Sequence, residues 1–427
     1  MKTYDLIVIG GGSGGMASAI SAYDNGIKNL MILEKEAYLG GILLQCIHNG
    51  FGLHTFKEEL TGPEYAYRFE KEVRNRNIEV HLSSMVIEIS NDNNELFVTY
   101  SNETEGLVKA KTKAIICATG CSERTRGAIG INGDRSSGVM TAGMAQKYLN
   151  IEGYMVGKRV FILGSGDIGL IMARRMVLEG AKVLGVAELM PYSNGLNRNI
   201  VQCLKDYDIP LYLHHTVKQV IGKTRVEKVV ICEVDDKLQF IPGKEMIFDV
   251  DTLLLSVGLL PNNPLLEKIN VKIHPRTRGP IVDESLQTSI PGIFACGNSL
   301  HVHDLVDFVT SEGTLAGLNA AKYIKNELKK DIKIHINNGK GVGYVLPQDV
   351  SLSNVNGVKI NFRVTQPYKD VYLVIKQGDN VLKKVKKPYL VPAEMENVII
   401  DNSLFVNKDS VTVEVCDVAW IDMYSLS

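Results

Sequence analysis

Two copies of one glycine pattern, each followed by an acidic residue, could bind the pyrophosphate and ribose of a dinucleotide. In Gly-x-Gly-x-x-Gly the first glycine permits a tight turn, the second lets the backbone approach a pyrophosphate, and the third lets a helix pack closely on a strand. A later carboxylate can accept hydrogen bonds from ribose hydroxyls. Two such sites in one chain indicate electron transfer between two cofactors. The residues are Gly10, Gly12, Gly15 and Glu34 in the first copy and Gly164, Gly166, Gly169 and Glu188 in the second.

Each glycine loop lies between a run typical of a buried strand and a run typical of a helix. The apolar residues 6–9 and 160–163 precede the loops, and residues after the first loop are apolar at helical spacing. Such a helix would direct its N-terminal amides and the positive end of its dipole at the phosphates. Further apolar runs, residues 30–33 and 183–187, lead to the two acids. The repeat therefore extends to whole domains of similar architecture.

The composition is typical of a globular protein, and the net charge does not favour binding to nucleic acid. The 427 residues are 45% hydrophobic and 22% charged, with a net charge of −1. No apolar run approaches the roughly 20 residues that span a bilayer, and the N-terminus carries no signal-type segment, so we expect a cytoplasmic protein without an integral membrane segment. The seven cysteines include no Cys-x-x-Cys pair, which excludes a secreted disulfide framework and a cysteine zinc site.

The order of strand-like, helix-like and turn-like runs predicts an α/β protein with two Rossmann-like domains, the second inserted in the first. We expect the first domain to comprise residues 1–150 and 280–330, and the inserted domain to comprise residues 151–279. Residues 331–427 alternate between apolar and polar and are rich in β-branched residues, which predicts a C-terminal all-β, sandwich-like domain. The single tryptophan, Trp420, is predicted to lie in its core.

Together these features resemble the two-dinucleotide-binding flavoprotein superfamily, which includes the pyridine nucleotide-disulfide oxidoreductases. The resemblance covers roughly residues 3–327. It implies that the first glycine loop binds FAD and that the inserted domain binds the nicotinamide cofactor. It also implies that residues 310–319 form a helix whose N-terminus faces the flavin. The residues assigned to FAD are Gly10, Gly12, Gly14, Gly15, Glu34, Lys35, Gly41, Ala118, Thr119, Gly120, Gly297 and Asn298, and those assigned to NAD are Gly164, Gly166, Asp167, Ile168, Gly169, Glu188 and Gly258.

Two of these residues bear on cofactor choice and binding. Gly297-Asn298 stands where the superfamily usually has Gly-Asp, so the ribityl partner keeps an acceptor oxygen and loses the charge. The Glu188 carboxylate would repel a 2′-phosphate, and no arginine occurs between Glu188 and Arg198. The sequence therefore favours NAD(H) over NADP(H).

The redox cysteines of the disulfide reductases are missing. In those enzymes two cysteines follow a Gly-Gly pair, which corresponds here to Gly40-Gly41, and their offsets hold Leu43 and His48. Cys46 lies between these two positions. The segment is expected to lie beside the flavin ring, where Cys46 and His48 are the candidate catalytic residues. The chain is therefore not expected to be a disulfide reductase of the usual mechanism.

Several of these side chains have alternative interpretations. Cys46 is either a single redox thiol or a packed apolar residue, and His48 either orients a substrate, tunes the flavin or is structural. His301 and His303 resemble a metal-binding pair, but the sequence shows no third ligand, so proximity to the flavin is favoured and no metal site is predicted.

A closer resemblance is carried by residues 118–124 and 139–146. These are similar to FAD/NAD-type subunits of amine, opine and hydroxyproline oxidising enzymes, and more similar to relatives that accompany glycerol-3-phosphate oxidising flavoproteins. This implies an FAD-dependent NAD(H) oxidoreductase that exchanges electrons with a partner flavoprotein or small acceptor, docked partly through the C-terminal β-domain. The alternatives are a single-cysteine NADH oxidase or peroxidase that uses Cys46, and a non-catalytic flavin-binding scaffold. The oligomeric state is left open.

Overall fold

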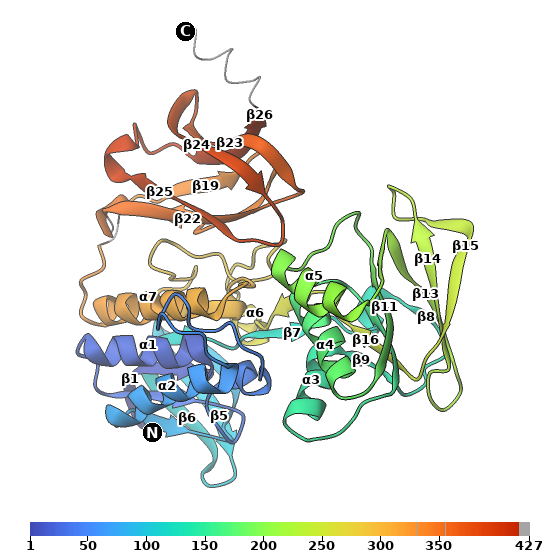
Figure 1. The fold of residues 1–427 in the computed structure, drawn as a ribbon. Helices are drawn as coiled ribbons and strands as arrows, with labels where there is room; N and C mark the ends of the chain where they lie inside the picture. The colour runs from blue at the N-terminus through green and yellow to red at the C-terminus, as the bar shows by residue number, and fades with distance from the viewer. Residues whose placement is uncertain (330, 355, 418–427) are drawn as a thin grey trace. The chain divides into compact units, whose positions relative to one another are not determined.

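The computed structural model describes residues 1–329, 331–354 and 356–417, which form two compact units (Figure 1). The first unit combines residues 1–121 with residues from 261 onward, and the second unit comprises residues 122–260. The second unit is therefore inserted in the first, as the sequence predicts. Where the chain passes from one unit to the other, two short strands pair with each other: β7 (Cys121–Glu123) and β17 (Leu259–Pro261).

A seven-stranded sheet forms the centre of the first unit. Its order is β3-β2-β1-β6-β5-β4, with β18 paired to β6. Five strands run parallel, and β4 and β5 form an antiparallel hairpin. The strands are β1 (Lys2–Ile9), β2 (Leu30–Leu33), β3 (Glu79–His81), β4 (Met85–Asp92), β5 (Glu95–Asn102), β6 (Gly106–Cys117) and β18 (Ile293–Ala295).

Helices α1 and α7 pack closely on each other because glycines line their contact (Figure 1). A Cβ added at Gly313 would lie 2.3 Å from the Gly14 carbonyl oxygen, and one at Gly317 would lie 2.1 Å from the Ser18 carbonyl oxygen. Helix α7 begins at Val306 and not at the predicted residue 310. The helices of this unit are α1 (Ser13–Asp24), α2 (Gly62–Asn75), α6 (Pro264–Lys268) and α7 (Val306–Ile324).

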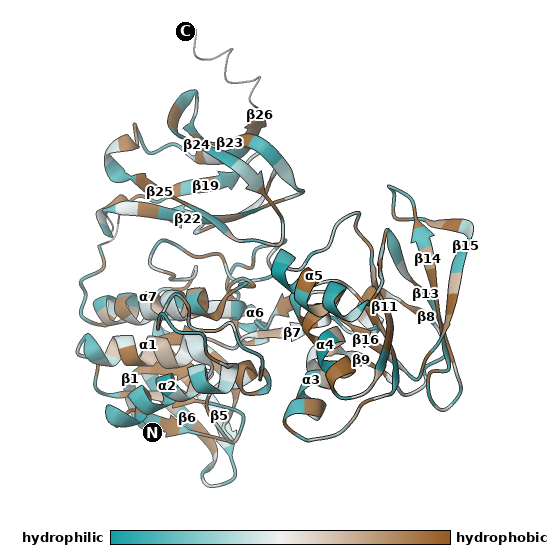
Figure 2. Cartoon of the chain, viewed as in Figure 1, coloured by the Kyte–Doolittle hydropathy of each residue, from teal (hydrophilic) through white to brown (hydrophobic). Residues whose placement is uncertain are grey.

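The second unit repeats this plan with a five-stranded parallel sheet in the order β12-β11-β10-β16-β9. A second sheet, in the order β15-β14-β13-β8, shares a hydrophobic cluster with it that includes Phe161, Val220 and Leu253. Figure 2 shows the apolar stretch at β11, which is buried over most of its length. The helices are α3 (Ala142–Asn150), α4 (Asp167–Leu178) and α5 (Asn197–Cys203), and the strands are β8 (Asn132–Gly133), β9 (Val139–Thr141), β10 (Arg159–Leu163), β11 (Lys182–Glu188), β12 (Leu211–Leu213), β13 (His215–Ile221), β14 (Lys228–Val234), β15 (Phe240–Asp249) and β16 (Thr252–Leu255).

The unit boundaries lie earlier than the expected residues 150 and 279. Strand β9 extends the sheet of the second unit by pairing with β16, so β9 and the helix α3 that follows it belong to that unit. Helix α6 belongs to the first unit, where Leu266 joins the same hydrophobic cluster as Ile7 of β1. Sequence runs identify strands, but the pairing partner decides to which sheet a strand belongs.

The C-terminal segment forms a β-sandwich, as predicted. Its two sheets have the orders β21-β19-β26-β23-β24 and β20-β22-β25. Alternating residues of both sheets form one hydrophobic cluster, and the expected place of Trp420 in this core lies outside the described residues. The strands are β19 (Ile334–Asn338), β20 (Val342–Leu346), β21 (Asp349–Val350), β22 (Gly357–Val364), β23 (Tyr368–Gln377), β24 (Asn380–Leu390), β25 (Glu396–Asp401) and β26 (Val411–Asp417).

The sandwich is hydrogen-bonded to the rest of the first unit through its own backbone and side chains. The Gln348 Oε1 atom accepts from the Val282 amide at 3.0 Å, and the Ser351 amide donates to a Glu284 carboxylate oxygen at 2.7 Å. These bonds involve buried groups, so the sandwich is a fixed part of this unit. Within the described residues, no helix is long and apolar enough to cross a membrane.

Candidate functional site

The first glycine loop is a close contact between three segments of backbone. A Cβ added at Gly10 would lie 2.3 Å from the Ala118 carbonyl oxygen, and one at Gly15 would lie 1.9 Å from the Gly10 carbonyl oxygen. Both positions therefore exclude any side chain. A Cβ at Gly12 would meet no atom within 4 Å. The middle glycine thus faces open space at the N-terminus of α1, where a phosphate can approach the backbone.

Glu34 follows β2 and is held against this loop. Its Oε2 atom accepts from the Gly11 amide at 2.6 Å, and its Oε1 atom accepts from the Glu36 amide at 2.8 Å. The carboxylate is buried, and each oxygen accepts one of these bonds, which leaves lone pairs for two ribose hydroxyls. Helix α1 has no acidic residue in its first turn and no side-chain cap, so its amides are available to an anion. Loop, helix and acid together fit the adenosine diphosphate part of FAD.

The second unit repeats the geometry of this loop. A Cβ added at Gly164 would lie 2.0 Å from the Ser256 carbonyl oxygen, and one at Gly169 would lie 2.6 Å from the Gly164 carbonyl oxygen. The nearest atom to a Cβ at Gly166 is a Ser256 hydroxyl 3.5 Å away. As in the first unit, neighbouring backbone occupies the space beside the first and third glycines, and the space beside the second glycine is open.

Glu188 repeats the hydrogen bonds of Glu34. Its Oε2 atom accepts from the Ser165 amide at 3.0 Å, and its Oε1 atom accepts from the Met190 amide at 3.0 Å. Two further donors contact it: the Ser165 hydroxyl at 2.5 Å and the Asn194 side-chain amide at 3.1 Å. Both oxygens therefore already accept two hydrogen bonds. A ribose bound here would have to replace one of them, and Asn194, which is exposed, is the donor with the most room to move.

The turns that follow the central strands correspond to each other as well. Gly120 and Gly258 both have a positive φ, of 68° and 104°. The Thr119 hydroxyl donates to the Asn262 carbonyl oxygen at 2.7 Å. In the first unit the Asn298 side-chain amide points to the Cys121 sulfur at 3.6 Å, which places this residue beside the start of β7. Residues predicted from the resemblance to contact FAD are thus brought to one edge of the sheet.

Three further predicted residues have other contacts in the structure. Lys35 is exposed and lies 3.9 Å from a Glu36 carboxylate oxygen. The Asp167 Oδ1 atom accepts from the Leu196 amide and the Asn199 side chain at 2.8 and 2.7 Å, so part of this carboxylate anchors α5. Ile168 packs against the core of the second unit.

Gly41 brings the segment with the candidate catalytic residues onto the first glycine loop. A Cβ at Gly41 would lie 3.2 Å from the Gly12 Cα atom, and its φ is 57°. Leu43, at a position of the missing cysteines, is buried. The His48 ring packs on Phe51 with its centroid 4.9 Å away. The segment therefore lies directly beside the open glycine of the FAD loop.

Cys46 has the properties of a packed thiol. Its Sγ atom donates to the Ile42 carbonyl oxygen at 3.3 Å. Burial raises the pKa of the Cys46 thiol to about 12, so the group is protonated at neutral pH. A nucleophilic or redox cysteine reacts as the thiolate. Cys46 is itself only partly buried, and both interpretations of this residue stay predictions, with the protonated thiol in support of the apolar one.

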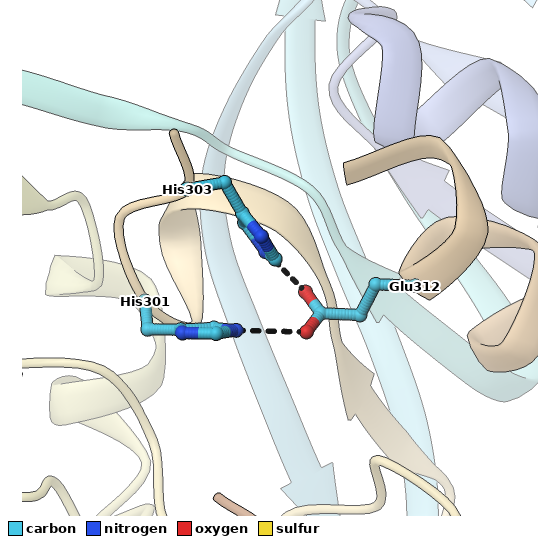
Figure 3. Close-up of side chains that lie close together, drawn as sticks. All are labelled: His301, His303 and Glu312. Atoms are coloured by element: carbon cyan, nitrogen blue, oxygen red, sulfur yellow. Dashed lines mark hydrogen bonds and ion pairs between the residues drawn. The ribbon is translucent and has the colours of Figure 1, made fainter. Parts of the chain in front are cut away.

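A buried cluster lies beside Gly297-Asn298, the turn assigned to FAD and called the FAD turn below. It contains a residue that the sequence analysis missed. The Glu312 carboxylate accepts hydrogen bonds from His301 Nε2 at 2.9 Å and His303 Nε2 at 3.1 Å (Figure 3). The Gly297 amide donates to the same carboxylate at 2.6 Å. Glu312 lies within α7, and no sequence spacing relates it to the two histidines, so only the packing of α7 on this loop reveals it.

The ligand atoms of these three residues lie within 4.8 Å of one another, close enough to hold a metal ion. In the hydrogen-bonded arrangement each imidazole Nε2 atom carries a proton, so binding of a metal would require the loss of both protons. The expectation of no metal site is kept as a prediction.

Two Rossmann-type units, each with a glycine loop and a buried acid beside it, are the architecture of a flavoprotein with two dinucleotide sites. A family model, pyridine nucleotide-disulphide oxidoreductase, matches residues 4–313. The chain belongs to this family, whose members are oxidoreductases that use FAD and NAD(P)H.

Curated relatives agree with this membership. The chain is 27% identical over 327 residues to an NADH oxidase of Methanocaldococcus jannaschii, covering 74% of this chain and 66% of that protein. It is 26% identical over 328 residues to a thioredoxin reductase of Ureaplasma parvum, covering 76% and 97%. It spans only 58% of the length of a similar alkyl hydroperoxide reductase protein of Pseudomonas aeruginosa.

The fold is that of solved thioredoxin reductases. The crystal structure of the T. acidophilum enzyme superposes with a TM-score of 0.63 at 23% identity, covering 75% of this chain and 99% of that one. The structure from Lactococcus lactis gives a TM-score of 0.62 at 19% identity. The matching part of the chain carries the two dinucleotide-binding units.

Proposed function

We propose that this chain is an FAD-dependent NAD(H) oxidoreductase that passes electrons between the nicotinamide and a partner flavoprotein or small acceptor. The observation that carries the proposal is the repeated carboxylate geometry. Glu34 and Glu188 each accept the amide of the residue after the first glycine of a loop, and each also accepts the amide two residues further along their own segment. Both units are thus organised for the ribose of a dinucleotide.

The residues of the chain bind and orient, and the cofactor supplies the electron chemistry. When bound, FAD exchanges two electrons with the nicotinamide. The open backbone at Gly12 and Gly166 admits the two pyrophosphates, and the N-termini of α1 and α4 stabilise their charge. Asn298 fits the ribityl chain through its amide, because its Nδ2 atom has only a weak sulfur acceptor at 3.6 Å.

The choice of NADH over NADPH rests on Glu188. This buried carboxylate accepts two backbone amides and two side-chain donors, which together stabilise its negative charge. A 2′-phosphate placed there would meet the negative charge of this carboxylate. We therefore expect NADPH to bind far more weakly than NADH.

An external acceptor is required because the usual intramolecular one is missing. Leu43 and His48 occupy the cysteine positions, and the Cys46 thiol is held protonated by burial. The peroxidase alternative needs the Cys46 thiolate and is disfavoured for the same reason. The closer resemblance in residues 118–124 and 139–146 supports a partner flavoprotein, with glycerol 3-phosphate as its substrate.

An anaerobic titration tests the oxidoreductase proposal. NADH added to the FAD-loaded protein should bleach the visible flavin band, and NADPH at the same concentration should bleach it much more slowly. An unchanged spectrum with both nucleotides would support the scaffold alternative and contradict the proposal.

A reconstitution tests the identity of the partner. The purified chain is mixed with a glycerol-3-phosphate oxidising flavoprotein, and glycerol 3-phosphate is added with NAD⁺. Formation of NADH that requires both proteins supports the partner proposal. Equal rates without this chain would refute it, while leaving the NADH titration unaffected.

A further inference from the structure

The cluster of His301, His303 and Glu312 is buried and forms a chain of hydrogen bonds with the FAD turn. Glu312 Oε2 accepts from the Gly297 amide at 2.6 Å and from His303 Nε2 at 3.1 Å, while Oε1 accepts from His301 Nε2 at 2.9 Å (Figure 3). The His303 amide donates to the Asn298 side-chain oxygen at 3.0 Å. The cluster is therefore one hydrogen bond from both residues of the turn assigned to FAD.

The hydrogen bonds define which atoms hold protons in the resting cluster. Burial favours neutral Glu312, but His303 and His301 outweigh it and hold the pKa of this carboxyl well below its usual range. Burial, reinforced by His303, lowers the pKa of His301. At neutral pH, Glu312 is ionised and His301 is neutral with its proton on Nε2. The Nδ1 atom of His301 is then the vacant proton site.

The two vacant Nδ1 atoms have different surroundings. His301 Nδ1 lies 3.5 Å from the Tyr344 hydroxyl, which can donate to the neutral ring or accept from the protonated one. His303 Nδ1 is buried and has no hydrogen-bond partner among the described residues. His301 Nδ1 is therefore the vacant nitrogen of this cluster that has a hydrogen-bond partner.

Residues of the C-terminal sandwich contact the cluster and the loop that carries its histidines. Tyr344 of β20 covers His301, and Arg363 of β22 donates to the Val302 carbonyl oxygen at 3.1 Å and to the Asp304 carboxylate. The positive charge of Arg363 also lowers the pKa of His301, and the buried thiol of Cys296, which follows β18, faces Glu312. Because His301 is buried, a change of charge nearby acts strongly on it.

We propose that His301 is a proton-holding positioning residue of the flavin site. Reduction of bound FAD by two electrons and one proton would place a negative charge at this site, and His301 would then take up a second proton, from solvent, at Nδ1. The electrons come from the two-electron donor, and the only bond formed on His301 is Nδ1–H. Glu312 and Tyr344 hold both protonation states in place. The inference requires bound FAD but not NADH as the electron donor.

The sign of the pH dependence follows from linkage. The negative charge on FAD favours protonated His301, so its pKa is higher in the reduced protein than in the oxidised protein. At a pH between these two pKa values, reduction of FAD is accompanied by the uptake of one extra proton by His301. Below the lower value His301 is protonated in both states, and above the higher value it is neutral in both. The window begins below pH 6.5, because the pKa of His301 in the resting protein lies below this ordinary value.

The midpoint potential of bound FAD, measured with chemical reductants against pH, tests the proposal. Uptake of one extra proton changes the equilibrium constant for FAD reduction by a further factor of ten per pH unit. For a two-electron couple this corresponds to a midpoint potential that changes by about 30 mV more per pH unit. We expect the wild-type slope to exceed that of His301→Gln by this amount within the window. His335→Gln is the matched control, because His335 pairs with Asp349 on the exposed part of the sandwich. Equal slopes for wild type and His301→Gln would overturn the proposal.

A second variant, Tyr344→Phe, keeps both histidines and removes only the hydroxyl that would accept a hydrogen bond from protonated His301. Tyr344→Phe should move the window of steeper slope to lower pH, because protonated His301 loses its partner at Nδ1. An unchanged window would overturn the proposal even if His301→Gln does not retain FAD. One equivalent of tightly bound metal in the purified protein, lost in His301→Gln, would also overturn it, because it would assign the imidazoles to a metal.

Discussion

The replacement of Glu188 by Gln, compared with the same change at Glu34, is the most informative pair of variants. Both acids are buried at the end of a strand and accept the amide that follows the first glycine of a loop. Glutamine keeps the size of the side chain and removes the charge. It also replaces an acceptor oxygen with an NH₂ group, so donors that face that side lose their acceptor.

The hydrogen bonds of each acid set the magnitude. In Glu188→Gln, the new NH₂ group faces either the two Ser165 donors or the Met190 and Asn194 donors, whichever way the amide turns. A hydrogen bond to a charged group contributes about 1.5–3 kcal/mol. Loss of one such bond to a ribose hydroxyl weakens binding by about 10- to 150-fold. We expect this loss in NADH affinity for Glu188→Gln, and in FAD affinity for Glu34→Gln.

The assay measures two affinities for each variant. FAD affinity is obtained by titrating apoprotein with FAD, and NADH affinity from the rate of anaerobic flavin bleaching against NADH concentration. The matched control is Asn194→Ala, which removes one neutral donor from Glu188 and should change NADH affinity by less than about tenfold. If Glu188→Gln impaired FAD binding and left NADH affinity unchanged, the assignment of the two sites would be refuted.

Three further outcomes follow from the contacts. Cys46→Ser should leave the steady-state NADH oxidation rate within about twofold, because the thiol is protonated; loss of activity would restore the peroxidase alternative. Asp304→Asn leaves the partly buried Arg363 guanidinium without its carboxylate and should destabilise the protein by about 2 kcal/mol in urea unfolding. Asp349→Asn, at an exposed pair, should have little effect. Gly12→Ala should fold normally and lose FAD affinity. Gly15→Ala should yield little folded protein, because its Cβ would lie 1.9 Å from a carbonyl oxygen. Circular dichroism and FAD titration check both variants, and a misfolded Gly12→Ala beside a folded, FAD-binding Gly15→Ala would contradict the roles given to these glycines.

The glycine loops and their acids could be predicted because each is a local pattern. A tight turn, an open amide end and a carboxylate at the end of the next strand depend on residues close together in sequence. The backbone contacts at Gly10 and Gly164 are those of the predicted tight turns, and Glu34 and Glu188 lie beside their loops, while the roles of both acids in ribose binding stay predictions. The alternating C-terminal strands were predictable for the same reason.

Features that depend on packing were not predictable from one sequence. Helix α7 begins at Val306 because its first turn is held by tertiary contacts: the Asp307 carboxylate accepts the Thr55 amide at 2.8 Å. Glu312 reaches the two histidines only because α7 packs on their loop. The C-terminal sandwich, expected to serve in docking, also contributes Tyr344 and Arg363 to the surroundings of the FAD turn.

The central claim is that this chain binds FAD and NADH in its two units and has no internal disulfide as a third redox centre. The most direct measurement is the number of NADH equivalents needed to reduce the FAD-loaded protein completely under anaerobic conditions. Flavin alone accepts two electrons, so we predict full bleaching at one equivalent of NADH per FAD, with no thiols gained in a parallel thiol assay. Uptake of a second equivalent with the appearance of two new thiols would contradict the account, because it would reveal a redox-active cysteine pair.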